Sequence, residues 1–333
     1  MLDAGRTLET AMVRLWPGED ERSCCSPGAL QRARQVAAAM GVPFHTLDLE
    51  ADFARHVVAP FVDSYVAGET PNPCVTCNPR RLSALVDMAT ELGLEGIATG
   101  HYARRRWIDG EPYLTRAQDR AKDQTYMLWS VPTDVLARLE FPLGDLGKPE
   151  VRDLAAEHGL PVADEPESQE ACFAADGYRE FLARRGVASR PGLIVDRDGT
   201  PLGTHGGQWR YTIGQRRGLG LSGPRPLYVL ERRAASNEVV VGEREALDQR
   251  TIAIRVMSDR GLDLDDDLEV QLRYRSPAVP VLRLERTHGG HVLAHLVAPF
   301  SGAAPGQSAV FYRGDVLIGG GVITTLSAAV QRV

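Results

Sequence analysis

The chain has 333 residues, of which 43% are hydrophobic and 25% are charged, and its formal net charge is −6. These values are typical of a globular protein with two or three domains, and they exclude a largely disordered chain. They also give no global case for nucleic-acid binding, which would have to depend on local basic patches.

No apolar run reaches the roughly 20 residues that a membrane span needs. Residues 1–16 carry acids and no apolar core, so we expect no signal peptide, no membrane contact and a cytoplasmic protein. The cysteines number five, and an odd count is typical of a reducing compartment in which thiols serve chemistry or metal binding.

The first half of the chain alternates predicted strands and helices. Short apolar segments predict strands at 8–16, 43–49 and 97–100, and helices are predicted at 26–41, 51–66 and roughly 79–92. Ser26 and Pro27 form a helix start, and Gly41 is a helix stop. The alternation predicts a parallel sheet, whose ligand crevice lies at the carboxyl ends of the strands.

The second half of the chain has a different pattern of predicted elements. Helices are expected at 148–158 and 177–185, and from Pro191 onward short alternating strands are separated by turns. The turn signals are Asp198-Gly199, Gly289-Gly290 and Arg313-Gly314-Asp315. We therefore predict an α/β plus β fold, with a parallel-sheet domain at 1–187 and two small β-barrel-like domains at 188–250 and 251–333.

Cys77 and Cys172 are the strongest candidates for chemistry, because each lies in a short polar segment expected to be an active-site loop. These segments are residues 70–78, TPNPCVTCN, and residues 164–173, DEPESQEACF. The residues alone leave several interpretations open: a redox pair of Cys74 and Cys77, a zinc site, an iron–sulfur cluster on Cys74, Cys77 and Cys172, buried apolar thiols, or thiolate chemistry. The polar, proline-rich flanks favour thiolate chemistry.

Three further groups are candidate RNA contacts. Lys122, Asp123 and Gln124 present a cation, a carboxylate and an amide in succession, which suits a phosphate and a base edge, although a solvated turn explains them equally well. His101 directly follows a predicted strand. Arginines beside aromatic residues, such as Arg273 and Tyr274, suit RNA because bases stack and phosphates pair with guanidinium groups.

Together these segments resemble the tRNA-specific 2-thiouridylase family, collinearly from Leu8 to the C-terminus. The segments that carry the resemblance are TPNPCVTCN (70–78), ATGHYAR (98–104), KDQTYML (122–128), FPLGDLGKPEVR (141–152), SQEACF (168–173), YTIGQRRGLG (211–220), RYRSP (273–277) and PGQSAVFY (305–312). The resemblance implies an adenine-nucleotide-hydrolase-like sheet, a helical tRNA-binding part from about residue 134, and two β domains.

The resemblance also implies an activity. It is the ATP- and magnesium-dependent 2-thiolation of the wobble uridine of tRNA, through adenylation and a cysteine persulfide. The implied partners are tRNA and a persulfide sulfur donor protein, and we expect a monomer.

The resemblance assigns roles residue by residue. Cys172 matches the persulfide carrier, and Cys77 matches the nucleophile that forms a transient disulfide with it. Gly100 and Val13 match nucleotide contacts. The positions that match tRNA contacts or border the target base are Asn72, Pro73, His101, Lys122, Asp123, Gln124, Arg273, Tyr274 and Gln307.

Two departures from the family pattern matter. Family members normally begin with a strand, a Ser-Gly-Gly-Val-Asp-Ser pyrophosphate loop and a helix, which would precede Met1 here, so we expect an incomplete sheet and weak ATP binding. Cys74 stands where some members have aspartate. Two alternatives therefore stay open: a non-catalytic tRNA-binding remnant without the ATP site, and an iron–sulfur-dependent tRNA thiolase that uses Cys74, Cys77 and Cys172.

Overall fold

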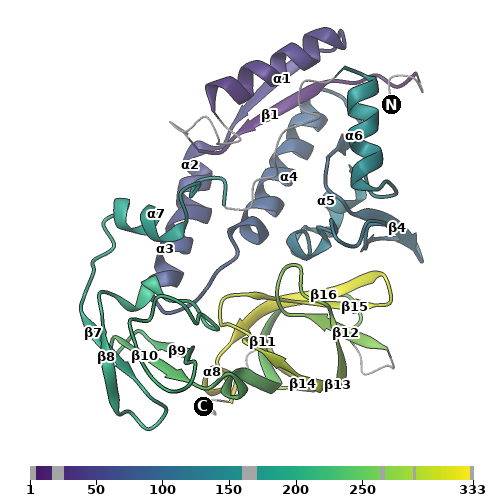
Figure 1. The fold of residues 1–333 in the computed structure, drawn as a ribbon. Helices are drawn as coiled ribbons and strands as arrows, with labels where there is room; N and C mark the ends of the chain where they lie inside the picture. Colours follow the sequence, from purple (N-terminus) through teal and green to yellow (C-terminus); the bar gives the residue numbers. More distant parts are fainter. Residues whose placement is uncertain (1–4, 17–25, 160–170, 263–266, 288–289, 331–333) are drawn as a thin grey trace.

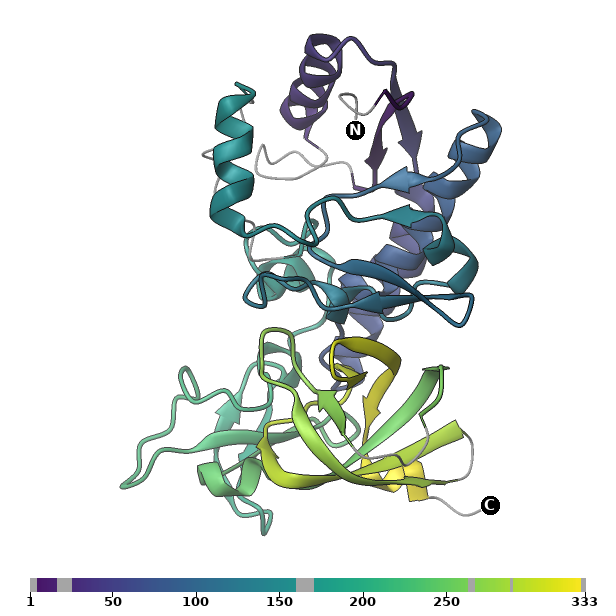
Figure 2. The same ribbon diagram turned by 90° about the vertical axis from the view of Figure 1, so that its right-hand side faces the viewer.

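The computed structural model describes residues 5–16, 26–159, 171–262, 267–287 and 290–330. Figure 1 shows an α/β part that holds the N-terminus, with two β-rich parts below it, and Figure 2 shows the same division after a quarter turn. Gly289 of the predicted Gly289-Gly290 turn, and residues 164–170 of the predicted Cys172 loop, fall outside the described residues.

The sheet of the α/β part consists of two parallel pairs, as the alternation of strands and helices predicts. β1 (Thr10–Arg14) pairs with β2 (Phe44–Asp48), and β3 (Ile97–Ala98) pairs with β6 (Leu139–Glu140). A cavity of about 670 Å³ separates the pairs, and β1 and β3 line its opposite sides. A salt bridge of 2.8 Å between Arg6 and Glu140 joins the two sides.

Most of the predicted helices form close to their predicted positions, and α1 does so at its predicted cap. α1 (Pro27–Ala39) begins after Ser26, whose hydroxyl accepts a hydrogen bond from the Ala29 amide (3.1 Å). The remaining helices around the sheet are α2 (Glu50–Phe53), the π-helical turn η2 (Ala54–Val58), α3 (Ala59–Val66), α5 (Thr133–Ala137), α6 (Lys148–Glu157) and α7 (Tyr178–Arg184). Within the described ranges, no helix is long and apolar enough to cross a bilayer.

α4 (Pro73–Glu91) contradicts the prediction, because it begins at Pro73 rather than near Pro79 and contains Cys74 and Cys77, which were expected in a loop. Asn72 is its N-cap, and the Asn72 side chain accepts a hydrogen bond from the Cys74 amide (3.1 Å). Pro73 takes the first helical position, where a missing N–H leaves no bond unmade. The Asn-Pro start therefore decides where the helix begins, and Pro79 is tolerated inside it.

The middle of the chain forms a four-stranded sheet with its own core. Its strands, in the order β8–β7–β10–β9, are β7 (Gly192–Val195), β8 (Pro201–His205), β9 (Tyr228–Arg233) and β10 (Glu238–Gly242). The short helices η4 (Gln208–Arg210) and η5 (Arg244–Leu247) flank it. The predicted Asp198-Gly199 turn joins β7 to β8, with Gly199 at a φ of 86°. Ile194, Val229 and Val239 pack with Tyr211 in the core.

The C-terminal third is a closed antiparallel barrel. Its strands are β11 (Asp248–Asp259), β12 (Leu268–Gln271), β13 (Val279–Arg286), β14 (His291–Ser301), β15 (Ser308–Arg313) and β16 (Val316–Thr324), and α8 (Leu326–Val330) follows. β11 pairs with both β14 and β16, which closes the six strands into a ring. The predicted turn at Arg313-Gly314-Asp315 joins β15 to β16. The predicted fold class, α/β followed by β domains, is confirmed.

The barrel sheet continues into the α/β part. The hairpin of β4 (Arg104–Ile108) and β5 (Glu111–Thr115) adds to β16, where Thr115 pairs with Val316. Next to it lies the segment of η3 (Thr125–Met127) to Ser130. Trp129 Nε1 donates to Ser308 Oγ (3.0 Å), and the Tyr126 hydroxyl donates to the Ser308 carbonyl (2.9 Å). The two parts therefore share one packed joint.

Candidate active site

The two cysteines singled out by the sequence belong to one apolar cluster. Cys77 is 9% exposed and buried with Phe53, Phe61 and Phe173, and the half-buried Cys172 packs against the same cluster. The Phe173 ring lies 5.1 Å from that of Phe61 and 5.7 Å from that of Phe53, in edge-to-face contacts. Residues far apart in the sequence thus meet in a dry, aromatic environment.

Cys172 lies in a tight turn, as its flanking sequence predicts. The Ala174 amide donates to the Ala171 carbonyl (2.8 Å), which closes the turn around Cys172 and Phe173. The buried Phe173 ring, 4.9 Å from that of Phe181 in α7, anchors the turn. The aromatic neighbour therefore fixes where the thiol-bearing backbone sits.

Cys74 differs from Cys77 although both lie at the start of α4. Taken over the whole residue, Cys74 is exposed. The pKa of its thiol is nevertheless raised because surrounding protein atoms desolvate the sulfur, while the Arg81 charge opposes that rise. Cys74, Cys77 and Cys172 all carry thiols. Among the described residues there is no group of three or more histidine, cysteine or acidic side chains able to hold a metal ion.

A polar chain lies behind the first turns of α4. Arg81 Nη2 donates to Asn78 Oδ1 (2.8 Å) and lies 3.3 Å from His101 Nε2, and His101 Nδ1 lies 2.7 Å from Thr99 Oγ1. Because a guanidinium only donates, His101 Nε2 must accept, and the imidazole is neutral with its proton on Nδ1. Burial, reinforced by the Arg81 charge, lowers the pKa of His101 to about 3.

The segment 122–124 turns two of its three polar side chains inward. Asp123 accepts hydrogen bonds from the Ala117 amide (2.9 Å) and the Thr125 hydroxyl (2.6 Å), and burial raises its pKa. Gln124 Oε1 accepts from the Tyr102 amide (2.9 Å). Lys122 instead lines a cavity of about 620 Å³ that Lys148 and Arg152 also line. All three residues were predicted as tRNA contacts. In the structure Asp123 and Gln124 bond to neighbouring backbone, and Lys122 lies on the wall of a cavity.

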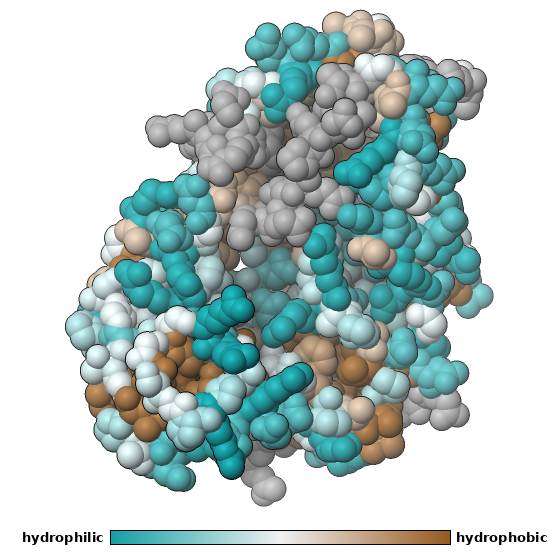
Figure 3. Space-filling view, in the orientation of Figure 1, coloured by the Kyte–Doolittle hydropathy of each residue, from teal (hydrophilic) through white to brown (hydrophobic). Residues whose placement is uncertain are grey.

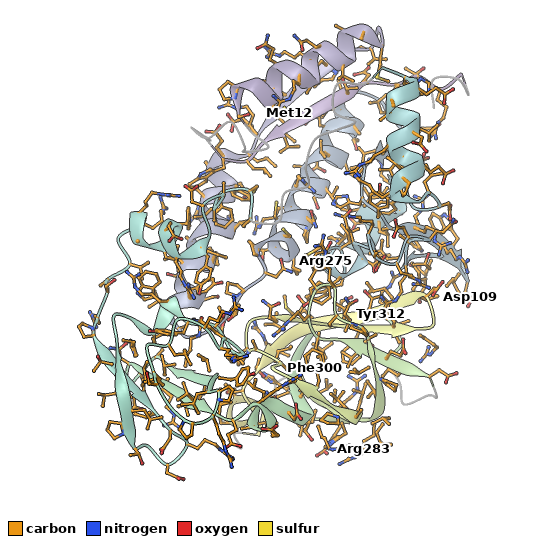
Figure 4. All side chains as sticks on the ribbon, viewed as in Figure 1. Met12, Asp109, Arg275, Arg283, Phe300 and Tyr312 are labelled. Carbon is orange, nitrogen blue, oxygen red and sulfur yellow. The ribbon has the colours of Figure 1, made fainter. Side chains whose placement is uncertain are left out.

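The barrel brings its predicted RNA contacts to the joint with the α/β part. Arg273 Nη2 donates to the Gly302 carbonyl (3.1 Å), and the Tyr274 ring lies 6.0 Å from that of Tyr126. Arg275 follows with a φ of 62°, and its guanidinium lies 5.3 Å from the Tyr274 ring centroid. Figure 4 shows Arg275 at the boundary between the barrel and the α/β part.

Thr70, ahead of α4, is the point at which all three parts meet. Gln307 Nε2 donates to the Thr70 carbonyl (2.6 Å), and the Thr70 amide donates to the Pro305 carbonyl (2.8 Å). Arg232 of β9 donates to the Thr70 hydroxyl (3.0 Å). Burial lowers the pKa of Arg232, whose guanidinium lies 5.5 Å from the Tyr65 ring centroid. Gln307, predicted as a tRNA contact, therefore also holds the segment that leads to Asn72.

Comparisons with known proteins agree with this architecture. Family models match the chain in three consecutive pieces: a tRNA methyl transferase HUP domain at 1–176, a tRNA methyl transferase PRC-barrel domain at 179–243 and an aminomethyltransferase beta-barrel domain at 251–323. The tRNA-specific 2-thiouridylase MnmA of Sorangium cellulosum is 43% identical over 97% of the chain and 87% of that protein. The chain belongs to the tRNA-specific 2-thiouridylase family.

Other members of the 2-thiouridylase family match equally broadly. The MnmA protein of Carboxydothermus hydrogenoformans is 40% identical over 97% of the chain and 92% of its own length. The bifunctional protein NifU/MnmA of Rubrobacter xylanophilus is 48% identical over 98% of the chain, and the match spans 66% of that longer protein. The resemblance found in the motifs therefore extends to overall identity.

The nucleotide positions implied by the 2-thiouridylase family lie at the sheet edge where such folds bind nucleotides. Val13 stands near the carboxyl end of β1, and Gly100 follows the carboxyl end of β3. A Cβ at Gly100 would meet only Leu143 Cδ1, at 3.8 Å, so this edge leaves room for a ligand.

Sequence reasoning missed three residues of this family site. Arg81 lies one helical turn from Asn78 and Cys77, so the i, i+3 and i, i+4 spacing was an available signal once the helix start was placed correctly. Ser130 and Thr70 act through contacts with segments remote in the sequence: the Ser130 hydroxyl donates to the Val75 carbonyl (2.8 Å), and Thr70 bonds to both β-rich parts. No local pattern marks such contacts.

Proposed function

We propose that the chain is a tRNA uridine 2-sulfurtransferase that replaces the C2 oxygen of the wobble uridine with sulfur in an ATP-dependent reaction. The observation that carries the proposal is the shared apolar cluster of Cys77 and Cys172. Family membership and the sulfur chemistry that two such thiols permit support the same conclusion.

Each thiol has a distinct task in this proposal. Cys172 carries a persulfide received from a sulfur donor protein, and the Cys77 thiolate attacks the inner sulfur of that persulfide. The outer sulfur leaves with the bonding electron pair for C2 of the uridine, and a Cys77–Cys172 disulfide remains, which an external thiol reduces. ATP, when bound near Val13 and Gly100, supplies the activation that makes the C2 oxygen a leaving group.

The surroundings of the thiols suit this task. Phe53, Phe61 and Phe173 belong to the cluster that buries Cys77 and packs against the half-buried Cys172, and such packing limits the access of water to the sulfurs. Asn72 and Pro73 are half-buried at the start of α4, where an extruded base would approach. Figure 3 shows a recess with hydrophilic walls in the middle of this face, between the α/β part and the β-rich parts.

The tRNA contacts fall into two groups in this proposal. Lys122, Arg273 and Tyr274 contact the RNA directly, because a lysine on a cavity wall and an arginine beside an aromatic ring suit phosphates and bases. His101, Asp123, Gln124 and Gln307 bond through their side chains to neighbouring segments of the protein and shape the RNA-binding surface from behind.

Cys172→Ser tests the proposal. The variant should form no 2-thiouridine, measured by nucleoside mass spectrometry. Its affinity for tRNA should stay within about twofold of that of the unmodified chain, since one sulfur-to-oxygen change removes no phosphate contact. Product formation by Cys172→Ser would refute the role of Cys172. Tight tRNA binding without product in the unmodified chain, supplied with ATP and a persulfide donor, would instead identify a non-catalytic tRNA-binding protein. A visible cluster absorbance after anaerobic purification would identify an iron–sulfur enzyme.

A further inference from the structure

Pro79 leaves a defect in the helix that carries Cys77. α4 continues through Pro79, which has no backbone N–H, so the carbonyl four residues earlier, that of Val75, lacks the hydrogen bond that a helix normally provides. The proline ring also crowds that carbonyl and tilts it outward. Cys77 lies in the middle of the affected turn.

Ser130 repairs this defect from outside the helix. Its hydroxyl donates to the Val75 carbonyl at 2.8 Å, a distance typical of a good O–H···O bond. Two further bonds come from the same short segment, because Asn78 Nδ2 donates to the Met127 carbonyl (2.8 Å) and Asn72 Nδ2 donates to Met127 Sδ (3.1 Å). The segment 127–130 therefore holds both ends of the turn that bears Cys77.

The segment that supplies these bonds is itself fixed. Trp129, 3% exposed, donates to Ser308 Oγ, and Tyr126, fully buried, donates to the Ser308 carbonyl. The Ser130 hydroxyl is thus presented by a rigid, packed neighbour rather than by a loose loop. A donor held in this way fixes the position of the Val75 carbonyl and of the helix turn that carries Cys77.

We propose that Ser130 is a positioning residue for Cys77, and that its hydroxyl takes the place of the helix bond removed by Pro79. The inference rests on the proposed function, in which the Cys77 sulfur must reach the Cys172 persulfide. Without the Ser130 hydroxyl the turn between Val75 and Pro79 loosens, and the Cys77 sulfur spends less time in line for attack, although neither its chemistry nor the RNA contacts change.

A double-mutant cycle with Pro79→Ala tests the proposal, because an alanine at position 79 restores the N–H that Val75 lacks. The full-length chain is prepared unmodified, as Ser130→Ala, as Pro79→Ala and as the double variant. Iodoacetamide labelling of Cys77, localised by tandem mass spectrometry, needs neither tRNA nor ATP. Ser130→Ala should raise the labelling rate about fivefold, as one neutral hydrogen bond would, and should have no effect in the Pro79→Ala background.

The same four proteins are assayed for tRNA thiolation, together with Ser130→Thr and Ser83→Ala. Ser130→Ala should lower kcat by about fivefold with an unchanged KM for tRNA. Ser130→Thr keeps the hydroxyl and should have the kcat of the unmodified chain. Ser83→Ala, a change on the same helix as Cys77, should leave both constants unchanged. Equal effects of Ser130→Ala in both backgrounds, or no effect in either, would overturn the proposal. If no variant thiolates tRNA but the labelling rates follow the cycle, the proposed function fails while the positioning role stands.

Discussion

Replacing Gly320 by alanine should weaken the joint between the barrel and the α/β part. A Cβ at this position of β16 would lie 2.5 Å from Trp129 Cε3 and 2.6 Å from Cδ2, whereas ordinary contacts begin near 3.4 Å. The indole would have to retreat by about 0.9 Å to restore that separation. Trp129 is 3% exposed and bound through Nε1 to Ser308, so a retreat of the indole disturbs its packed contacts and strains this hydrogen bond.

The cost follows from two effects. Overpacking of a dense core typically destabilises by about 1–3 kcal/mol, and loss of the Trp129–Ser308 hydrogen bond adds about 1 kcal/mol. The expected loss of unfolding free energy is therefore about 2–4 kcal/mol. Urea unfolding followed by tryptophan fluorescence measures it.

Gly206→Ala is the matched control for Gly320→Ala. Nothing lies within 4 Å of a Cβ at Gly206, and its φ is not in the left-handed region, so this variant should be neutral or stabilise by up to about 1 kcal/mol. A Gly320→Ala midpoint equal to that of the unmodified chain would refute the steric reasoning. Recovery of the lost stability in Gly320→Ala combined with Trp129→Leu would confirm that the clash is with the indole.

Two further predictions concern charge. The folded-state pKa of His101, about 3, lies below its ordinary value of 6.5, so the unfolded state binds a proton first as pH falls. The stabilisation contributed by neutral His101 is complete above pH 6.5 and is lost below it, at up to about 1.4 kcal/mol per pH unit. His101→Gln should therefore flatten the fall in urea midpoint between pH 7 and 4.5, and parallel curves would contradict the burial argument. Arg273→Ala should weaken tRNA binding and reduce the slope of log affinity against log salt by about 1, as loss of one phosphate contact would. Arg250→Ala is the control, because it also removes a guanidinium bound to a carbonyl. An unchanged salt slope in Arg273→Ala would show that Arg273 contacts no phosphate and has only a structural role.

Local signals predicted much of the fold correctly. Ser26 with Pro27 starts α1, and the Asp198-Gly199 and Arg313-Gly314-Asp315 turns form hairpins, because these residues act through their own backbone preferences. The start of α4 was mispredicted since Pro79 is a local helix breaker whose effect a remote serine cancels. Tertiary contacts override local preference at this one place, and it is next to Cys77.

The sequence singled out the two thiols of the candidate site but not the residues that support them. The flanking residues of Cys77 and Cys172 singled out both thiols, and the fold brings them to one cluster. Thr70 gave no local signal, since its importance comes from bonds to Gln307 and Arg232, which lie 237 and 162 residues further along the sequence. Cys74 and Cys77 form one CxxC in the sequence, yet helical geometry exposes Cys74 and buries Cys77.

The pairing of Thr115 with Val316 affects how the molecule is assembled during synthesis. The hairpin of β4 and β5 leaves the ribosome long before β16 is made, so its outer edge waits for a partner until nearly the whole polypeptide has emerged. Contacts this remote have a large loop-closure entropy and form late in folding. During that interval the edge of β5 that will meet β16 is unpaired, and unpaired strand edges are sites at which other chains can add.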